Sequence, residues 1–394
     1  MTSLKVMLVA AEPSGDVLGA GLARAMRVRL APAAVSFVGV GGPRMAAEGV
    51  QSPFDISELS ILGWFDGLRA YGRVKRRVRD TVAVALREKP DVAVLIDSWG
   101  FTIRVARALR AVRPGLPLVK YVGPQVWASR PGRARTLAAA VDHLLALNSF
   151  DVPWFERANL ATTFVGNPAL GLDLASASAE RFRSHIGAAA DDEVLIVLPG
   201  SRSKEVDRIS PAFQAAVARL KSGRPGLHVA VVAAESVADQ VRAAVAGWPF
   251  PVHLVEGESE KRDAMKGATL ALACSGTVST ELALAGCPMV IAYRIDALTY
   301  ALVRPIITCR YATLMNIAAD RMVVPEFLQE RCTPEALAQA MAERLDNPGL
   351  RESQVADQNA ALDLMGRGAG DPSDNAARAV CDLLALKGVT SPPG

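Results

Sequence analysis

Strand-sized apolar runs alternate with amphipathic helical stretches along the whole chain, and this alternation restricts the possible folds most strongly. Runs such as VAVLI (92–96) and VLIVL (194–198) contain no polar residue, which is typical of strands buried on both faces of a parallel sheet. The helical stretches between them would cover those faces. We therefore predict an α/β protein. Its strands are expected at 5–12, 36–42, 92–97, 118–123, 143–148, 162–167, 193–200, 228–234, 251–257, 270–274 and 289–293.

The length of 394 residues exceeds what one core usually supports, so two domains are expected. We place the first at residues 1–170 and the second at 171–345, and we predict a linker in the Ala-, Ser- and Gly-rich segment 168–190. The hydrophobic content of 51% with 21% charged residues is that of a folded protein.

Several classes of protein are disfavoured by composition. A net charge of +4 argues against a dedicated nucleic-acid binder, so no nucleic-acid partner is expected. The five cysteines never form a C-x-x-C spacing, which suits a reducing cytosol and predicts no metal site. The first residues are interpreted as a strand and not a signal peptide, and the longest apolar runs fall short of the roughly 20 residues that a bilayer requires.

A Ser-Gly-Thr turn follows the predicted strand 270–274. Gly276 allows close approach to the backbone, while Ser275 and Thr277 offer hydroxyl groups. The helix that follows directs N–H groups and the positive end of its dipole toward this turn, where a diphosphate could bind. The Glu281 carboxylate could accept both hydroxyls of a ribose. The turn therefore predicts a nucleotide site, although an ordinary strand-to-helix turn with a solvated acid fits the same residues.

Arg202 follows another predicted strand, at the end of the sequence PGSR (199–202). Ligands of open α/β sheets bind at the carboxyl ends of strands, and a guanidinium can hold a diphosphate by two hydrogen bonds. Because both loops follow strands of one predicted sheet, we expect Arg202 to share a site with the Ser-Gly-Thr turn. A surface ion pair is the alternative.

The segment 54–79 combines apolar and basic residues in a way that suits an anionic lipid surface. The alternative is a helix that packs on the core and exposes a solvated basic face. Its apolar residues are Ile61, Leu62, Trp64, Phe65 and Leu68, and its basic residues are Arg69, Arg73, Lys75, Arg76, Arg77 and Arg79.

Ten motifs in a specific order cover nearly the whole chain and resemble those of the lipid-A-disaccharide synthase family, which are inverting glycosyltransferases. The most informative are AAEPSGDVLGAGL (10–22), IDSWGF (96–101), YVGPQVWASR (121–130), FVGNP (164–168), LPGSRSKEV (198–206), SGTVSTELAL (275–284) and TLMNIAADRMVVPEFLQ (313–329).

The resemblance implies the GT-B fold, in which two Rossmann-like domains with parallel sheets face an interdomain cleft. The first domain would bind the acceptor and face the membrane, the second would bind the UDP-sugar, and residues 346–394 would pack back on the first. The implied reaction transfers 2,3-diacylglucosamine from UDP-2,3-diacylglucosamine to 2,3-diacylglucosamine 1-phosphate, forming a β-1,6 disaccharide and UDP. No cofactor and no metal are expected.

The resemblance also assigns roles to individual residues. Arg202 would contact the diphosphate and Glu281 the ribose, while the Ser-Gly-Thr turn would bind the phosphates through backbone and hydroxyl groups. Four further positions would line the donor side of the cleft: Ser201, Asn316, Glu326 and Gln329.

Inversion requires a base that removes the proton of the acceptor hydroxyl. The resemblance favours Asp97, which ends a predicted strand, whereas the residues alone fit a cap of the next helix equally well. Asp16 is the rival base or an acceptor-orienting group. Ser14 and Gly15 are assigned to the acceptor side, although a tight turn and an N-cap would explain them too.

Some first-domain motifs depart from the family pattern. The family usually has Pro-Asp-Phe-Asn where this chain has Trp99, Gly100, Phe101 and Thr102. Two alternatives therefore stay open: another GT-B UDP-sugar transferase or epimerase, and a UDP-sugar- or lipid-binding protein without turnover. The resemblance further implies a cytoplasmic protein peripherally attached to the inner membrane, and a homodimer.

Overall fold

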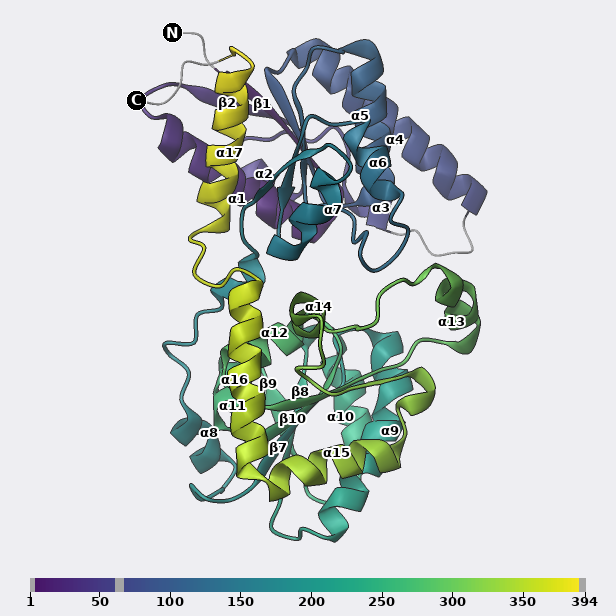
Figure 1. Cartoon of the computed structure of the whole chain (residues 1–394), viewed down its shortest axis with the longest axis vertical. Helices are drawn as coiled ribbons and strands as arrows, with labels where there is room; N and C mark the ends of the chain where they lie inside the picture. Colours follow the sequence, from purple (N-terminus) through teal and green to yellow (C-terminus); the bar gives the residue numbers. More distant parts are fainter. Residues whose placement is uncertain (1–3, 61–66, 390–394) are drawn as a thin grey trace. The chain divides into compact units, whose positions relative to one another are not determined.

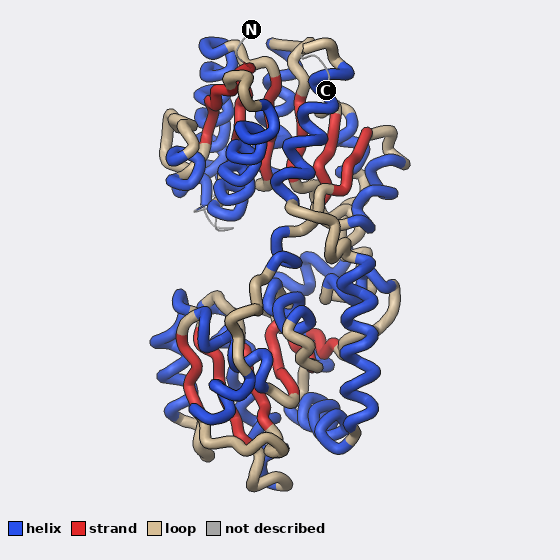
Figure 2. The backbone as a smooth tube through the Cα atoms, turned by 90° about the vertical axis from the view of Figure 1, so that its left-hand side faces the viewer, coloured by secondary structure: helices blue, strands red, loops and turns tan. Residues whose placement is uncertain are grey.

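The computed structural model describes residues 4–60 and 67–389, which divide into two compact units. Unit 1 comprises the chain up to Pro168 together with the stretch from Gly368 onward, and unit 2 comprises Ala169–Arg367. Each unit contains one six-stranded sheet, and every strand pair is parallel. Figure 2 shows the strands of each unit enclosed between helices, as the apolar runs predict.

The sheet of unit 1 has the strand order β2-β1-β3-β4-β5-β6. Its order reverses between β1 and β3, which makes the carboxyl ends of these strands the expected binding position. The strands are β1 (Leu4–Ala10), β2 (Val35–Val40), β3 (Val92–Ile96), β4 (Leu118–Tyr121), β5 (His143–Ala146) and β6 (Ala161–Phe164). The helices are α1 (Pro13–Leu30), α2 (Pro43–Ala47), α3 (Ser57–Ser60), α4 (Gly67–Glu88), α5 (Trp99–Val112), α6 (Arg133–Ala138), α7 (Val152–Glu156) and α17 (Pro372–Leu386).

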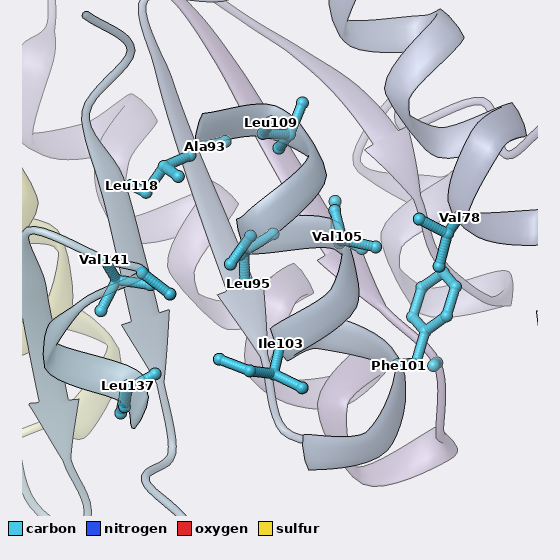
Figure 3. Close-up of a cluster of buried hydrophobic side chains, with 14 of the residues drawn as sticks. Val78, Ala93, Leu95, Phe101, Ile103, Val105, Leu109, Leu118, Leu137 and Val141 are labelled. Atoms are coloured by element: carbon cyan, nitrogen blue, oxygen red, sulfur yellow. The ribbon is translucent and has the colours of Figure 1, made fainter. Parts of the chain in front are cut away.

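Alternate residues of β3 enter different cores on the two faces of this sheet. Ala93 and Leu95 pack with Val105 and Leu109 of α5, as the close-up in Figure 3 shows. Val94 belongs to the core on the other face, together with residues of α1 and α17. Both faces of β3 are therefore buried, which explains its uninterrupted apolar sequence.

Helix α17 returns from the far end of the sequence to complete the core beside α1 (Figure 1). A Cβ on Gly21 of α1 would lie only 2.5 Å from Ser373 Oγ, so a glycine permits this close approach. The chain re-enters unit 1 at Gly368, later than the residue 346 that we expected, because α16 (Pro348–Leu364) packs on α12 (Thr277–Leu284) and α14 (Leu314–Ala319) in unit 2.

The sheet of unit 2 has the order β12-β11-β10-β7-β8-β9, and its order reverses between β7 and β10. The strands are β7 (Val194–Leu198), β8 (His228–Ala233), β9 (His253–Glu256), β10 (Leu270–Cys274), β11 (Met289–Tyr293) and β12 (Glu326–Leu328). The remaining helices are α8 (Ala179–His185), α9 (Ser203–Ser222), α10 (Ala238–Ala246), α11 (Glu258–Gly267), α13 (Ala297–Val303) and α15 (Pro334–Asp346).

Two features of unit 2 differ from the sequence-based expectation. Part of the predicted linker forms α8, because Ser178 caps the helix and Phe182 is buried. Strand β12 was not predicted, since it has three residues and directly follows Pro325.

Candidate active site

A cavity of about 600 Å³ lies at the point where the strand order of the unit 2 sheet reverses. The loops after β7 and β10 form part of its wall, together with the ends of β8 and β9. Six of the nine predicted donor residues line it: Ser201, Arg202, Ser275, Gly276, Thr277 and Glu281. These separate segments therefore meet at one edge of the sheet, as their positions at strand ends predicted.

The loop after β7 contributes an arginine that is held by a neighbouring acid. Arg202 Nη1 lies 2.7 Å from Glu205 Oε1, and this hydrogen bond raises the pKa of Arg202. A side chain at Gly200, where φ is +118°, would be strained and would meet Glu205 at 3.0 Å. Arg202 does form an ion pair, but the pair lines the cavity, and 79% of the arginine side chain remains exposed.

The loop after β10 opens its backbone toward the cavity. No atom would lie within 4 Å of a Cβ on Gly276, so there is open space beside this residue. The Ser279 hydroxyl donates to the Gly276 carbonyl at 2.8 Å and is therefore used within the first turn of α12. The N-terminal end of α12, with the hydroxyls of Ser275 and Thr277, suits an anionic ligand.

Glu281 is paired with a lysine that the sequence did not identify. Lys261 Nζ lies 3.0 Å from Glu281 Oε2 and 2.7 Å from Glu258 Oε2. Lys261 acts on Glu281 both through its charge and through a side-chain hydrogen bond. Burial lowers the Lys261 pKa, but the two carboxylates outweigh this effect and the net shift is upward.

Three predicted donor residues lie outside the cavity wall. Asn316 is fully buried, and its side chain makes four hydrogen bonds, two of them accepted from the Val323 and Val324 amides. Glu326 accepts from Asn316 Nδ2 and from two amides of the preceding loop. Gln329 accepts from the Ile295 amide at 3.3 Å. These contacts give Asn316 and Glu326 a structural function in holding α14 and the segments on either side of it.

In unit 1, Asp97 lies where β3 ends, beside the reversal of strand order. Its carboxylate accepts a hydrogen bond from the Ser14 hydroxyl at 2.9 Å, which brings the ends of β1 and β3 together. A Cβ at Gly15 would lie 3.2 Å from the Ala10 Cβ, so the glycine eases the packing of α1 against the end of β1. The N-cap of α5 is Ser98 and not Asp97. The capping alternative for Asp97 is therefore not what the structure shows.

Asp16 occupies a different environment. It is 3% exposed, and its carboxylate accepts from the amides of Gly42, Arg44 and Met45 at 2.8–3.0 Å. These three bonds hold the start of α2. They favour a structural role over that of a base.

The predicted lipid-facing segment is only partly described. Ile61, Leu62, Trp64 and Phe65 lie outside the described residues, and for Leu68 and Arg69 only the helical backbone is described. On α4, Val74 and Val78 are buried in the core, whereas Lys75, Arg76 and Arg79 are exposed.

Two arginines of α4 make contacts within unit 1. Arg77 bonds both Glu58 oxygens and Asp80, and lies 4.7 Å from the Phe54 ring centroid. Arg73 donates to the Glu58 carbonyl at 3.4 Å. The helix thus packs on the core and also exposes a basic face.

Within residues 4–60 and 67–389, no helix combines the length and hydropathy of a membrane span. The same residues contain no group of three or more His, Cys, Asp or Glu side chains arranged to hold a metal ion.

A family model described as lipid-A-disaccharide synthetase matches residues 6–380. The chain belongs to the lipid-A-disaccharide synthetase family. It is 43% identical over 394 residues to the lipid-A-disaccharide synthase of Rhodospirillum centenum, with coverage of 100% of this chain and 98% of the relative. Membership of the family makes the protein a glycosyltransferase.

Solved structures of UDP-sugar enzymes share the fold. The S. aureus MnaA–UDP co-structure superposes with a TM-score of 0.62 at 13% identity and covers 98% of both chains. MurG of Acinetobacter baumannii gives a TM-score of 0.53 at 15% identity, covering 92% of this chain and 99% of MurG. The two parallel sheets and these neighbours confirm the predicted α/β class and GT-B fold.

Proposed function

We propose that the protein transfers 2,3-diacylglucosamine from UDP-2,3-diacylglucosamine to 2,3-diacylglucosamine 1-phosphate, producing the β-1,6 disaccharide 1-phosphate and UDP. The observation that carries this proposal is the family match over residues 6–380. The cavity of unit 2 supports its donor half, because a cation, a Ser-Gly-Thr turn and a carboxylate converge there.

In the proposed donor site, Arg202 and the α12 N-terminus bind the diphosphate and Glu281 accepts the ribose hydroxyls. The Arg202 guanidinium is exposed enough to exchange Glu205 for phosphate oxygens. As the glycosidic bond to UDP breaks, its electron pair passes to the leaving phosphate oxygen. Cationic and N–H groups at that position would stabilise the developing charge.

Asp97 is the proposed base. The acceptor hydroxyl oxygen forms the new bond to the anomeric carbon from the face opposite UDP, and its proton passes to the Asp97 carboxylate. Support comes from the position of Asp97 at the strand-order reversal of unit 1 and from its solvent access, which the buried Asp16 lacks. Ser14 would orient the carboxylate through its hydrogen bond.

The acceptor and the membrane are assigned to unit 1. The exposed Lys75, Arg76 and Arg79 of α4 give a basic surface suited to the anionic cytoplasmic face of the inner membrane. We assign the protein to the cytoplasm with peripheral attachment to that membrane, and we propose that it acts as a homodimer.

The decisive experiment measures UDP release from UDP-2,3-diacylglucosamine with and without 2,3-diacylglucosamine 1-phosphate. We expect release that depends on the acceptor and falls at least 100-fold in Asp97→Asn, whereas Asp191→Asn, an exposed control in unit 2, should match the parent. Epimerised donor without UDP release would indicate an epimerase. Donor binding without either product would indicate a binding protein.

A further inference from the structure

Lys120 of β4 is a charged residue buried directly beneath the end of β3. It is 2% exposed, and its Nζ donates to the main-chain carbonyl of Asp97 and, at 2.9 Å, to Thr102 Oγ1. A buried ammonium is costly, and an apolar side chain of similar length would usually serve stability as well or better. Stability of the core therefore does not explain why a lysine stands here.

The peptide that Lys120 contacts has an unusual backbone conformation. Asp97 and Ser98 have φ of +50° and +37°, which non-glycine residues adopt only at a cost. The Asp97 carbonyl accepts from Lys120 and, at 2.8 Å, from Thr102 Oγ1. The Asp97 amide donates to the Tyr121 carbonyl at 2.9 Å. The backbone N–H and C=O of this strained residue are therefore both held by hydrogen bonds from residues of β4 and α5.

We propose that Lys120 is a positioning residue, whose hydrogen bond to the Asp97 carbonyl holds the left-handed Asp97–Ser98 turn and thereby the Asp97 carboxylate. This inference rests on the proposed role of Asp97 as base. Lys120 and Thr102 hold the backbone of Asp97, and the backbone in turn sets the position of the Asp97 carboxylate. The Ser14 hydroxyl contacts that carboxylate on the other side.

The charge state of Lys120 matters near neutral pH. Burial lowers the pKa of Lys120 to about 7, although the carboxylates of Asp97 and Glu12 act in the opposite direction. A charged donor forms hydrogen bonds roughly twice as strong as a neutral one. As the pH rises through about 7, the ammonium loses its proton and its hold on the turn weakens. We expect kcat to fall over this range.

The test compares Lys120→Met with the parent in steady-state kinetics from pH 5.5 to 9. Misplacing a reacting group by about 1 Å can cost about 100-fold, so we expect kcat to fall 10- to 100-fold while the donor KM changes less than twofold. The fall of kcat through about pH 7 should be absent from the variant. An unchanged kcat, or an unchanged pH profile, would overturn the proposal.

A second pair of variants tests the same contact in case Lys120→Met does not fold. Thr102→Val keeps the shape but removes the hydroxyl that bonds both Lys120 and the Asp97 carbonyl, and Thr102→Ser restores it. We expect kcat to fall in the valine variant and to recover in the serine variant, with UDP affinity within error of the parent in both. The valine variant should unfold somewhat more easily than the parent, because the buried Lys120 loses one partner, but both variants should be folded under the assay conditions. Equal loss in the two variants would contradict the proposed contact.

The same assay separates this inference from the role of Asp97. If Asp97→Asn abolishes turnover and Lys120→Met leaves it intact, Asp97 is the base and the positioning role is wrong. If Asp97→Asn retains full turnover, the proposed base is wrong, and the positioning proposal fails with it. Loss in both single variants, with the altered pH profile in Lys120→Met, supports both.

Discussion

Lys261 Nζ lies 3.0 Å from Glu281 Oε2, so the carboxylate proposed for the ribose already has a cation beside it. This lysine also lines the cavity and reaches Glu258 on the same helix. The pair therefore links α11 to α12 across the wall of the proposed donor site.

Lys261→Met should weaken UDP binding about tenfold, because it removes a cation from an anion-binding cavity and leaves Glu281 without its counter-charge. A tenfold change corresponds to about 1.4 kcal/mol, within reach of a half-buried ion pair. Isothermal titration calorimetry with UDP checks this. The control is Lys266→Met on the same helix, whose side chain donates to the Ala177 carbonyl and does not line the cavity. Equal affinities in both variants would contradict the assignment.

Asn316→Ala should lower the free energy of unfolding of unit 2 by about 2–4 kcal/mol, since it leaves buried amide and carboxylate groups without partners. Urea denaturation measures the change. Gln339→Ala is the control, because this exposed side chain donates a hydrogen bond to Glu343 on the same helix. A stable Asn316→Ala protein that has lost UDP affinity would instead restore Asn316 to the donor site.

Deprotonation of the buried Lys120 should raise the free energy of unfolding as the pH rises from about 7 toward 10.5. The folded pKa of about 7 lies below the ordinary value of 10.5, so in this window the unfolded chain binds more protons than the folded one. Below about 7 the full cost of the buried charge is present. Each pKa unit corresponds to about 1.4 kcal/mol, so the total gain is a few kcal/mol.

Chemical denaturation across this pH range measures the gain. Lys120→Met should show a curve that lacks this rise. If the free energy of unfolding depends on pH in the same way in both proteins, Lys120 is not the group whose titration changes the stability.

Arg76 and Arg79 should contribute to membrane binding more than Arg77 does. We expect the Arg76→Met/Arg79→Met variant to bind vesicles containing phosphatidylglycerol about tenfold more weakly, since each exposed base near an anionic surface contributes about 1 kcal/mol before screening by salt. Sedimentation with vesicles measures it. Arg77→Met should mainly lower stability, because Arg77 bonds Glu58 and Asp80. Weaker binding in Arg77→Met alone would reverse this assignment.

The parts of the site that the sequence predicted are those encoded by short local patterns. Arg202 follows one apolar run and Gly276 follows another, so their positions at strand ends predicted a shared site without knowledge of distant contacts. Lys261 and Lys120 were missed because their partners lie 20 and 23 residues away in the sequence. No local pattern distinguishes such lysines from solvated ones.

Asn316 and Glu326 were singled out by the sequence, but their role was not. The resemblance assigned both to the donor side of the cleft, but the sequence could not distinguish binding a ligand from accepting hydrogen bonds from nearby backbone amides. Likewise, Asp16 and Asp97 both follow strands of the first sheet, and the sequence does not reveal the three amides that surround Asp16 or the solvent access of Asp97.

The core of unit 1 depends on α17, whose Ala377, Val380 and Leu384 are buried with residues of α1. During synthesis, the ribosome completes this helix more than two hundred residues after the last strand of the same sheet. At about 5–20 residues per second, nascent unit 1 waits roughly 10 to 40 s with that apolar surface uncovered. Unit 2, a continuous stretch of chain, has no such delay. The half of the protein translated first is thus the last to be completed, and it is the half that chaperones would need to protect.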